Sequence, residues 1–165
     1  MEPRMKNPIM VIPGAMEALQ LLGGAARESG VPITTLYLVE VRASQINGCS
    51  VCLDMHSREM RAAGESDERI AMVGAWREAP YYSDAERAAL ELTEAATRLA
   101  DRSDPVPDAI WEQAARHYDT SQLAGLVLMI AGINAWNRIN AATRQVTGNW
   151  VEQWIERPEP AGQTA

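Results

Sequence analysis

Residues 46–65 read INGCSVCLDMHSREMRAAGE, and this stretch contains both cysteines of the chain and one of its two histidines. Asn47 and Gly48 interrupt the pattern before it, and Gly64 stands where a helix would end, so we expect a helix from about 49 to 63. In a helix, the steps of three and four residues from Cys49 to Cys52 to His56 put all three side chains on one face. The stretch therefore predicts two sulfurs and an imidazole close together.

The rest of the chain repeats this helical pattern. Apolar residues recur at steps of three and four from Leu36 to Ile46. Ser83 and Glu86 form a capping-box pattern, and a long helix is expected from about 121 to 146. We predict an all-α fold, a single compact domain of six to eight helices over residues 1–165, with peripheral tails at about 1–13 and 157–165 and a short segment around NWVEQWI.

The long helix is apolar through LAGLVLMIAGI, residues 123–133, which is more than one amphipathic stripe requires. We expect this helix to be central in the fold or to pack against another subunit, which favours a homo-oligomer. The INAWNR segment that follows carries several polar residues, which need partners if they are buried. Packing at a subunit interface is the favoured interpretation of that segment.

Charge and hydropathy exclude several partners. The formal net charge is −7, and the sequence has no basic cluster. It therefore gives no sign of a positively charged surface for nucleic acid or an anionic membrane. Pro8 and Pro13 interrupt the N-terminal apolar residues, and no signal peptide is evident. The longest apolar run is shorter than the ~20 residues of a membrane-spanning helix. We expect a cytoplasmic protein, in which two close cysteines are more often catalytic or metal-binding than structural.

The cysteine–histidine group has four interpretations. A zinc site would use Cys49, Cys52 and His56 but lacks a fourth ligand, because the other histidine, His117, is distant in sequence. A structural disulfide between the cysteines would close too small a loop to stabilise the fold much. Chance clustering is the third interpretation. A dithiol redox site fits best, and we therefore expect no metal ligand and no cofactor.

The two cysteines have different advantages as nucleophiles. Cys49 lies in the first turn of the expected helix, where backbone N–H groups and the helix dipole favour a thiolate and lower its pKa. Cys52 lies one turn from His56, which is placed to accept its proton. In either case one thiolate attacks an electrophile such as a peroxide oxygen, and the second thiol condenses with the sulfenic acid to form a disulfide.

Three segments in order resemble one family. VRASQINGCSVCLDMHSREMRAAGE, WREAPYYSDAERAALELTEA and INAWNRI are similar to the alkylhydroperoxidase D-like branch of the carboxymuconolactone decarboxylase superfamily, over residues 32–150. The resemblance implies an alkylhydroperoxidase D-like helical fold that assembles as trimers or hexamers, a hydroperoxide substrate and a dithiol protein as reductant. It also implies that Cys52 meets the peroxide, that Cys49 resolves it and that His56 belongs to a proton relay. On this basis we expect Cys52 to be the attacking residue.

The chain departs from the family pattern around this site. The family's catalytic glutamate precedes the first cysteine by twelve residues, and this chain has Tyr37 there. Glu40 follows one turn later on the same expected helix, and its carboxylate could face the same region. Full members often have a histidine between the cysteines, where this chain has Val51. The candidate site residues are thus Cys52, Cys49, His56, Glu40 and Tyr37, with packing as the alternative role for Tyr37.

Three functions follow from these residues. The first is a thiol-dependent peroxidase that cycles through an intramolecular disulfide. The second is a redox-responsive regulatory or binding protein with weak turnover. The third, decarboxylation of a small lactone acid, derives only from the superfamily's name and ranks last, since it does not require a cysteine pair.

Overall fold

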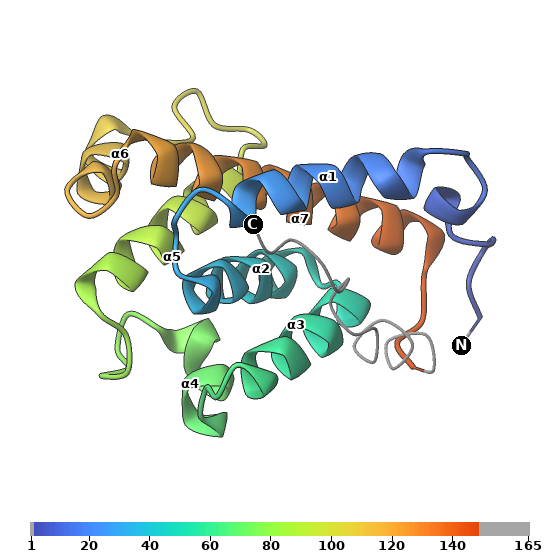
Figure 1. The fold of residues 1–165 in the computed structure, drawn as a ribbon, viewed down its shortest axis with the longest axis horizontal. Coiled ribbons are helices and arrows are strands. Elements are labelled where there is room, and N and C mark those ends of the chain that lie inside the picture. Colours follow the sequence, from blue (N-terminus) through green and yellow to red (C-terminus); the bar gives the residue numbers. More distant parts are fainter. Residues whose placement is uncertain (1, 149–165) are drawn as a thin grey trace, which may run out of the picture.

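The structure is a computed structural model, and it describes residues 2–148. Over these residues the chain forms seven α-helices and two 3-10 helices with no strand, which confirms the predicted all-α, single compact fold (Figure 1). The elements are η1 (Pro8–Met10), α1 (Ala15–Arg27), α2 (Ile33–Asn47), α3 (Ser50–Ala62), α4 (Asp67–Met72), η2 (Val73–Ala75), α5 (Asp84–Thr97), α6 (Asp108–Ala115) and α7 (Thr120–Thr143). The expected NWVEQWI segment, residues 149–155, and the expected tail at 157–165 lie outside the described residues.

Side-chain caps fix where several helices begin. Ser83 and Glu86 form the expected capping box at α5, and Asp119 and Gln122 form a second one at α7. Cys49 caps α3 with its own sulfur. The helix predicted from 49 to 63 and the long helix predicted from 121 to 146 are therefore confirmed to within a few residues.

The helix that begins after Ser66 is short. Helix α4 ends at Met72, and the chain continues through η2 into turns before Pro80. The cause is tertiary: Trp76 is buried and donates to Glu94, and the Arg87 guanidinium donates to the carbonyl oxygens of Trp76 and Ala79. These hydrogen bonds hold the backbone in an irregular conformation. In a continued helix the same carbonyl oxygens would be used within the helix.

Helix α2 is the centre of the fold. Figure 1 shows α1 and α7 running side by side above it and α3 below it, and α2 contacts α3, α5 and α7. One apolar cluster fills the space between α2 and the α1, α5, α6 and α7 layer, and a second fills the space between α2, α3 and the α4–η2 segment. The fold thus fixes α3 against the central helix of the domain.

The turn between α2 and α3 is tied to α7 by asparagines. Asn47 Nδ2 donates to Asn134 Oδ1 at 3.0 Å and to Asn137 Oδ1 at 2.9 Å, and Asn137 Nδ2 donates to Ser44 Oγ at 3.0 Å. Gly48 follows with a φ of +68°, which an L side chain rarely adopts. Asn134 and Asn137 of the INAWNR segment therefore have hydrogen-bond partners within the chain and do not need a subunit interface to supply them. They set the position of Cys49.

Candidate active site

Both sulfurs lie at the N-terminus of α3. The backbone N–H of Cys52 donates to Cys49 Sγ at 3.4 Å, so the Cys49 side chain folds back over the first turn as an N-cap. Cys49 and Cys52 are free thiols with exposed fractions of 3% and 1%. The expectation that the two sulfurs point to one place therefore agrees with the geometry.

Asn140 of α7 joins the pair from the opposite helix. Its Nδ2 lies 3.4 Å from Cys52 Sγ and 3.7 Å from Cys49 Sγ. Its Oδ1 accepts a hydrogen bond from Asn7 Nδ2 at 3.0 Å, which turns the amide nitrogen toward the sulfurs. Local sequence carries no signal for this role of Asn140, because its contact with the cysteines is purely tertiary.

The surroundings shift the pKa values of the two thiols in opposite directions. A hydrogen bond from Cys52 lowers the pKa of Cys49 to about 6, although burial opposes the shift; the Cys52 backbone N–H and Asn140 lower this pKa further. The hydrogen bond to Cys49 and burial both raise the pKa of Cys52. The geometry therefore favours a Cys49 thiolate stabilised by a Cys52 thiol, and the helix N-terminus accounts for this better than the His56 spacing.

A cavity opens beside this thiolate. It has a volume of about 460 Å³ and is lined by Gly48, Cys49, Ser50, Val51, Asn140, Ala141, Arg144 and Gln145, together with Glu2. Cys49 reaches this cavity, and Cys52 is not among its lining residues. A small molecule in the cavity would meet Cys49 first.

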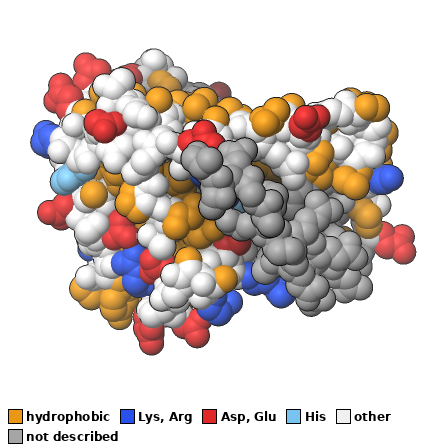
Figure 2. Space-filling model, in the orientation of Figure 1, with side chains coloured by type: hydrophobic (Ala, Val, Ile, Leu, Met, Phe, Trp, Pro, Cys, Tyr) orange, Lys and Arg blue, Asp and Glu red, His pale blue; other side chains and the backbone are white. Residues whose placement is uncertain are grey.

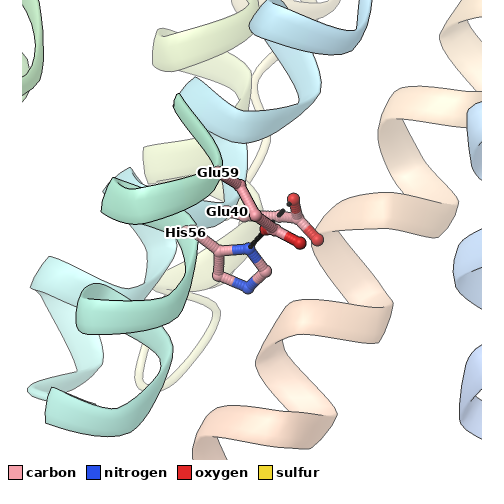
Figure 3. A group of neighbouring side chains, drawn as sticks. All are labelled: Glu40, His56 and Glu59. Atoms are coloured by element: carbon pink, nitrogen blue, oxygen red, sulfur yellow. Dashed lines mark hydrogen bonds and ion pairs between the residues drawn. The ribbon is translucent and has the colours of Figure 1, made fainter. Parts of the chain in front are cut away.

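A second polar group lies further along α3. Figure 3 shows Glu40 of α2 and His56 and Glu59 of α3 converging, with the His56 Nδ1 turned toward the carboxylates. His56 Nδ1 lies 2.7 Å from Glu59 Oε2 and 3.4 Å from Glu40 Oε2. Burial lowers the pKa of His56, but Glu40 and Glu59 outweigh it and leave that pKa raised. Burial raises the pKa of Glu40, against the opposing effect of His56 and Arg27.

Tyr37 belongs to this carboxylate group, and no hydrogen bond to a sulfur is found for it. The Arg27 guanidinium lies over its ring, 5.3 Å from the centroid, and also lies 3.5 Å from Glu40 Oε1. Burial raises the pKa of Tyr37, as does the nearby Glu59. Glu40, one turn after Tyr37, thus lies beside the imidazole of His56.

The five predicted site residues therefore form two groups on α2 and α3. Cys49 and Cys52 share contacts with Asn140, while His56, Glu40 and Tyr37 share contacts with Glu59 and Arg27. Cys52 and His56 are both buried on α3, one turn apart, yet within residues 2–148 no hydrogen bond links the imidazole to either sulfur. Glu59 was missed in the sequence, although its spacing of three residues from His56 was a usable signal.

Comparison with known proteins places the chain in a family. Residues 13–95 match the carboxymuconolactone decarboxylase family. The uncharacterized protein YdfG of Bacillus subtilis is 39% identical over 132 residues, covering 80% of this chain and 88% of that protein. The chain belongs to the carboxymuconolactone decarboxylase family. This family membership confirms the resemblance inferred from the cysteine motif.

Solved structures agree with this membership. A protein of unknown function from Agrobacterium tumefaciens, named for antioxidant defence as an AhpD protein, superposes with a TM-score of 0.82 at 33% identity, covering 90% of this chain and 99% of that one. The debrominase Bmp8 superposes with a TM-score of 0.74 at 19% identity, covering 87% and 76%, which shows a shared fold alone. The shared fold does not by itself assign a reaction. None of the helices within residues 2–148 is both long and apolar enough to cross a membrane.

Proposed function

We propose that this family member is a thiol-dependent peroxidase that reduces hydroperoxides through Cys49 and Cys52. The observation that carries the proposal is the cysteine pair itself: the two sulfurs share the first turn of α3 and the Asn140 amide, and Cys49 lines a cavity. The similarity to an AhpD-named antioxidant protein at 33% identity supports the same chemistry. The helix N-terminus favours Cys49 as the attacking residue, in place of the Cys52 assignment that the family resemblance implies.

The reaction balances with these two residues and one external proton. The Cys49 thiolate attacks the distal peroxide oxygen, the O–O bond breaks, and the departing alkoxide takes a proton to leave as an alcohol. The Cys49 sulfenic acid then condenses with the Cys52 thiol, which releases water and forms the disulfide. A dithiol reductant reopens the disulfide and returns both cysteines to the thiol state.

We assign the supply of the alkoxide proton to His56, with Glu40 and Glu59 as the residues that orient the imidazole. The two carboxylates lie on the Nδ1 side of the ring, which leaves Nε2 as the other exchangeable position. The Tyr37 ring packs against the Arg27 guanidinium, which in turn faces Glu40, so Tyr37 acts on this group as a positioning residue.

A trapping experiment tests the proposal. The Cys52→Ser variant, treated with one equivalent of cumene hydroperoxide and the sulfenic-acid reagent dimedone, is expected to carry the adduct on Cys49. The Cys49→Ser variant is expected to react at least about tenfold more slowly, because burial still raises the pKa of Cys52 and Cys52 is not among the residues that line the cavity. If the adduct forms on Cys52 of the Cys49→Ser variant and not on Cys49 of the Cys52→Ser variant, Cys52 is the attacking residue and the peroxidase function still holds. Equal inertness of both variants and the parent would refute the proposed function.

A second function is favoured by the burial of both thiols. With exposed fractions of 3% and 1%, the pair could oxidise slowly and act as a redox-responsive binding or regulatory site. In that case oxidation would change assembly or partner contacts with negligible turnover, which native mass measurements of the reduced and oxidised forms would reveal. Residues 2–148 offer no observation that favours lactone decarboxylation, and we do not propose it.

The proposed cycle sets requirements for the surroundings of the protein. Free thiols at rest fit a reducing compartment such as the cytosol, and a dithiol protein is the natural electron donor.

We also propose assembly into trimers or hexamers. Ala124, Val127, Leu128 and Ala131 form an exposed apolar stripe on α7, in addition to the stripe that faces the core.

A further inference from the structure

Glu40, His56 and Glu59 bring three metal-binding groups to one point between α2 and α3 (Figure 3). One donor atom from each, a ring nitrogen and two carboxylate oxygens, lies within 4.8 Å of the others. The Glu40 carboxylate and the imidazole are buried, with exposed fractions of 5% and 3%, while the Glu59 side chain is 28% exposed. The group is thus enclosed on one side and reachable from solvent at Glu59.

The Glu40 carboxylate has one oxygen unused. Its Oε1 faces Arg27 at 3.5 Å, whereas its Oε2 is directed at the imidazole and accepts no hydrogen bond from any described residue. A buried carboxylate oxygen without a donor is costly, and such an atom calls for a partner. Arg27 acts as the outer-shell residue that orients Glu40, which is how carboxylate ligands are commonly held in metal sites.

The spacing of the donors fits a small divalent ion. Ligands bonded at ~2.0–2.2 Å to such an ion lie roughly 3 to 3.5 Å from each other. Here Glu40 Oε2 lies 3.4 Å from His56 Nδ1, within that range, and Glu59 Oε2 lies 2.7 Å from it, a hydrogen-bond distance that a small outward shift of the partly exposed Glu59 would bring into the range. Two carboxylates and one imidazole form a hard-to-borderline ligand set, typical of zinc and manganese sites and of catalytic zinc with an open position.

We propose that Glu40, His56 and Glu59 form a binding site for one divalent transition-metal ion of the Zn²⁺ or Mn²⁺ class. The sequence pointed to no such site, because the alternative zinc site considered there used the two cysteines. The proposed site uses neither sulfur, and it does not depend on peroxide reduction. The ion competes with a proton for His56 Nδ1, since a protonated imidazole between the two carboxylates is the other way to balance their charge.

Metal binding is best measured in a chain that lacks both thiols. The Cys49→Ser, Cys52→Ser double variant of the full chain removes the competing sulfur ligands and is treated with chelator, then dialysed against Zn²⁺. We expect one equivalent of bound zinc per chain and a rise in the thermal unfolding midpoint. With Co²⁺ as the probe, ligand-field bands without thiolate charge transfer are expected in both the double variant and the parent.

A matched pair of variants on α3 locates the ion. In the double-cysteine background, Glu59→Gln is expected to weaken zinc binding at least about tenfold, because removal of even an outer-shell partner costs 10–100-fold. Asp54→Asn changes another carboxylate of α3 with a similar exposure of 24%, and it should leave binding unchanged. Undiminished binding in Glu59→Gln, or no binding in the double variant, would overturn the proposal. Thiolate charge-transfer bands in the parent alone would place the metal at the cysteines.

Discussion

Cys49 combines three features that stabilise a thiolate. It accepts the N–H of Cys52 at the start of α3, it pairs with the Cys52 thiol, and it lies near the amide of Asn140. Together these contacts outweigh the burial that would otherwise keep the sulfur protonated. The hydrogen bond to Cys49 and burial raise the pKa of Cys52, against the opposing effect of Asn140, which fits the proposed nucleophilic role of Cys49 and resolving role of Cys52.

The pH dependence of alkylation tests this assignment. Because the pKa of Cys49 is lowered to about 6, its reaction with iodoacetamide should be near its plateau at neutral pH and fall as pH decreases through about 6. Asn140→Ala removes a donor to the sulfurs and should move the midpoint upward by up to about one unit. Ser50→Ala changes an exposed neighbour of Cys49 and should leave the midpoint in place. A midpoint near the ordinary value in the parent would contradict the assignment.

We propose that Glu40 performs the role that the missing family glutamate would otherwise have. It already contacts the imidazole, while Tyr37 is engaged with Arg27. Tyr37→Glu is therefore expected to change the rate of peroxide reduction less than about threefold, whereas Glu40→Gln should lower it about tenfold or more, because proton transfer typically contributes 10²–10⁴-fold. Steady-state assays with a dithiol donor compare the two. A large gain in Tyr37→Glu would instead show that a carboxylate at that position limits catalysis.

At the level of elements, the contact between α1 and α7 depends on one glycine. A Cβ atom added at Gly125 would lie 2.3 Å from the Cβ of Ser29 and 3.1 Å from the Ala26 carbonyl oxygen. The same addition at Gly132, seven residues along α7, would meet only Leu22 at 3.7 Å, which is ordinary contact. The two glycines thus have different roles in one helix.

These glycines give a matched pair of variants. Gly125→Ala should lower the free energy of unfolding by about 1–3 kcal/mol, since the overlap forces α1 and α7 apart. Gly132→Ala should raise it by up to about 1 kcal/mol, because alanine favours the helix and meets no obstacle. Chemical denaturation of both variants measures the difference. Equal effects would mean that α1 and α7 are not packed as closely as described.

At the level of the whole molecule, apolar surface remains uncovered. Figure 2 shows hydrophobic side chains along the edge formed by α1, where Leu21 is 67% exposed. Val127 and Leu128 add an exposed apolar stripe on α7. Exposed apolar patches of this kind mark protein contacts, which supports the proposed assembly.

The mass of the protein in solution tests that assembly. Light scattering should give three or six chains per particle, and Leu128→Glu should lower this number because it places a charge in the apolar stripe. Met72→Glu alters a side chain of similar exposure, 37% against 38%, at the end of α4, and should leave the mass unchanged. A parent that is monomeric at micromolar concentration would contradict the assembly.

Much of the fold was predictable from local sequence, and part of the site was not. The α3 boundaries, the Ser83 capping box and the closeness of the cysteines follow from helical spacing and helix-end residues. The contacts of Asn140 with the sulfurs and of Glu40 with His56 join residues on different helices, which no local pattern specifies. For that reason the sequence placed His56 with Cys52, whereas its observed partners are carboxylates.

The central claim is that Cys49 and Cys52 form one redox pair. Intact mass measurement of the full chain, before and after one equivalent of hydroperoxide under non-reducing conditions, tests it most directly. We predict the loss of two hydrogen atoms with no added oxygen, reversal by a dithiol, and no such loss in Cys49→Ser or Cys52→Ser. Two free thiols persisting in the parent after the peroxide has been supplied, or stable addition of oxygen without a disulfide, would contradict the account.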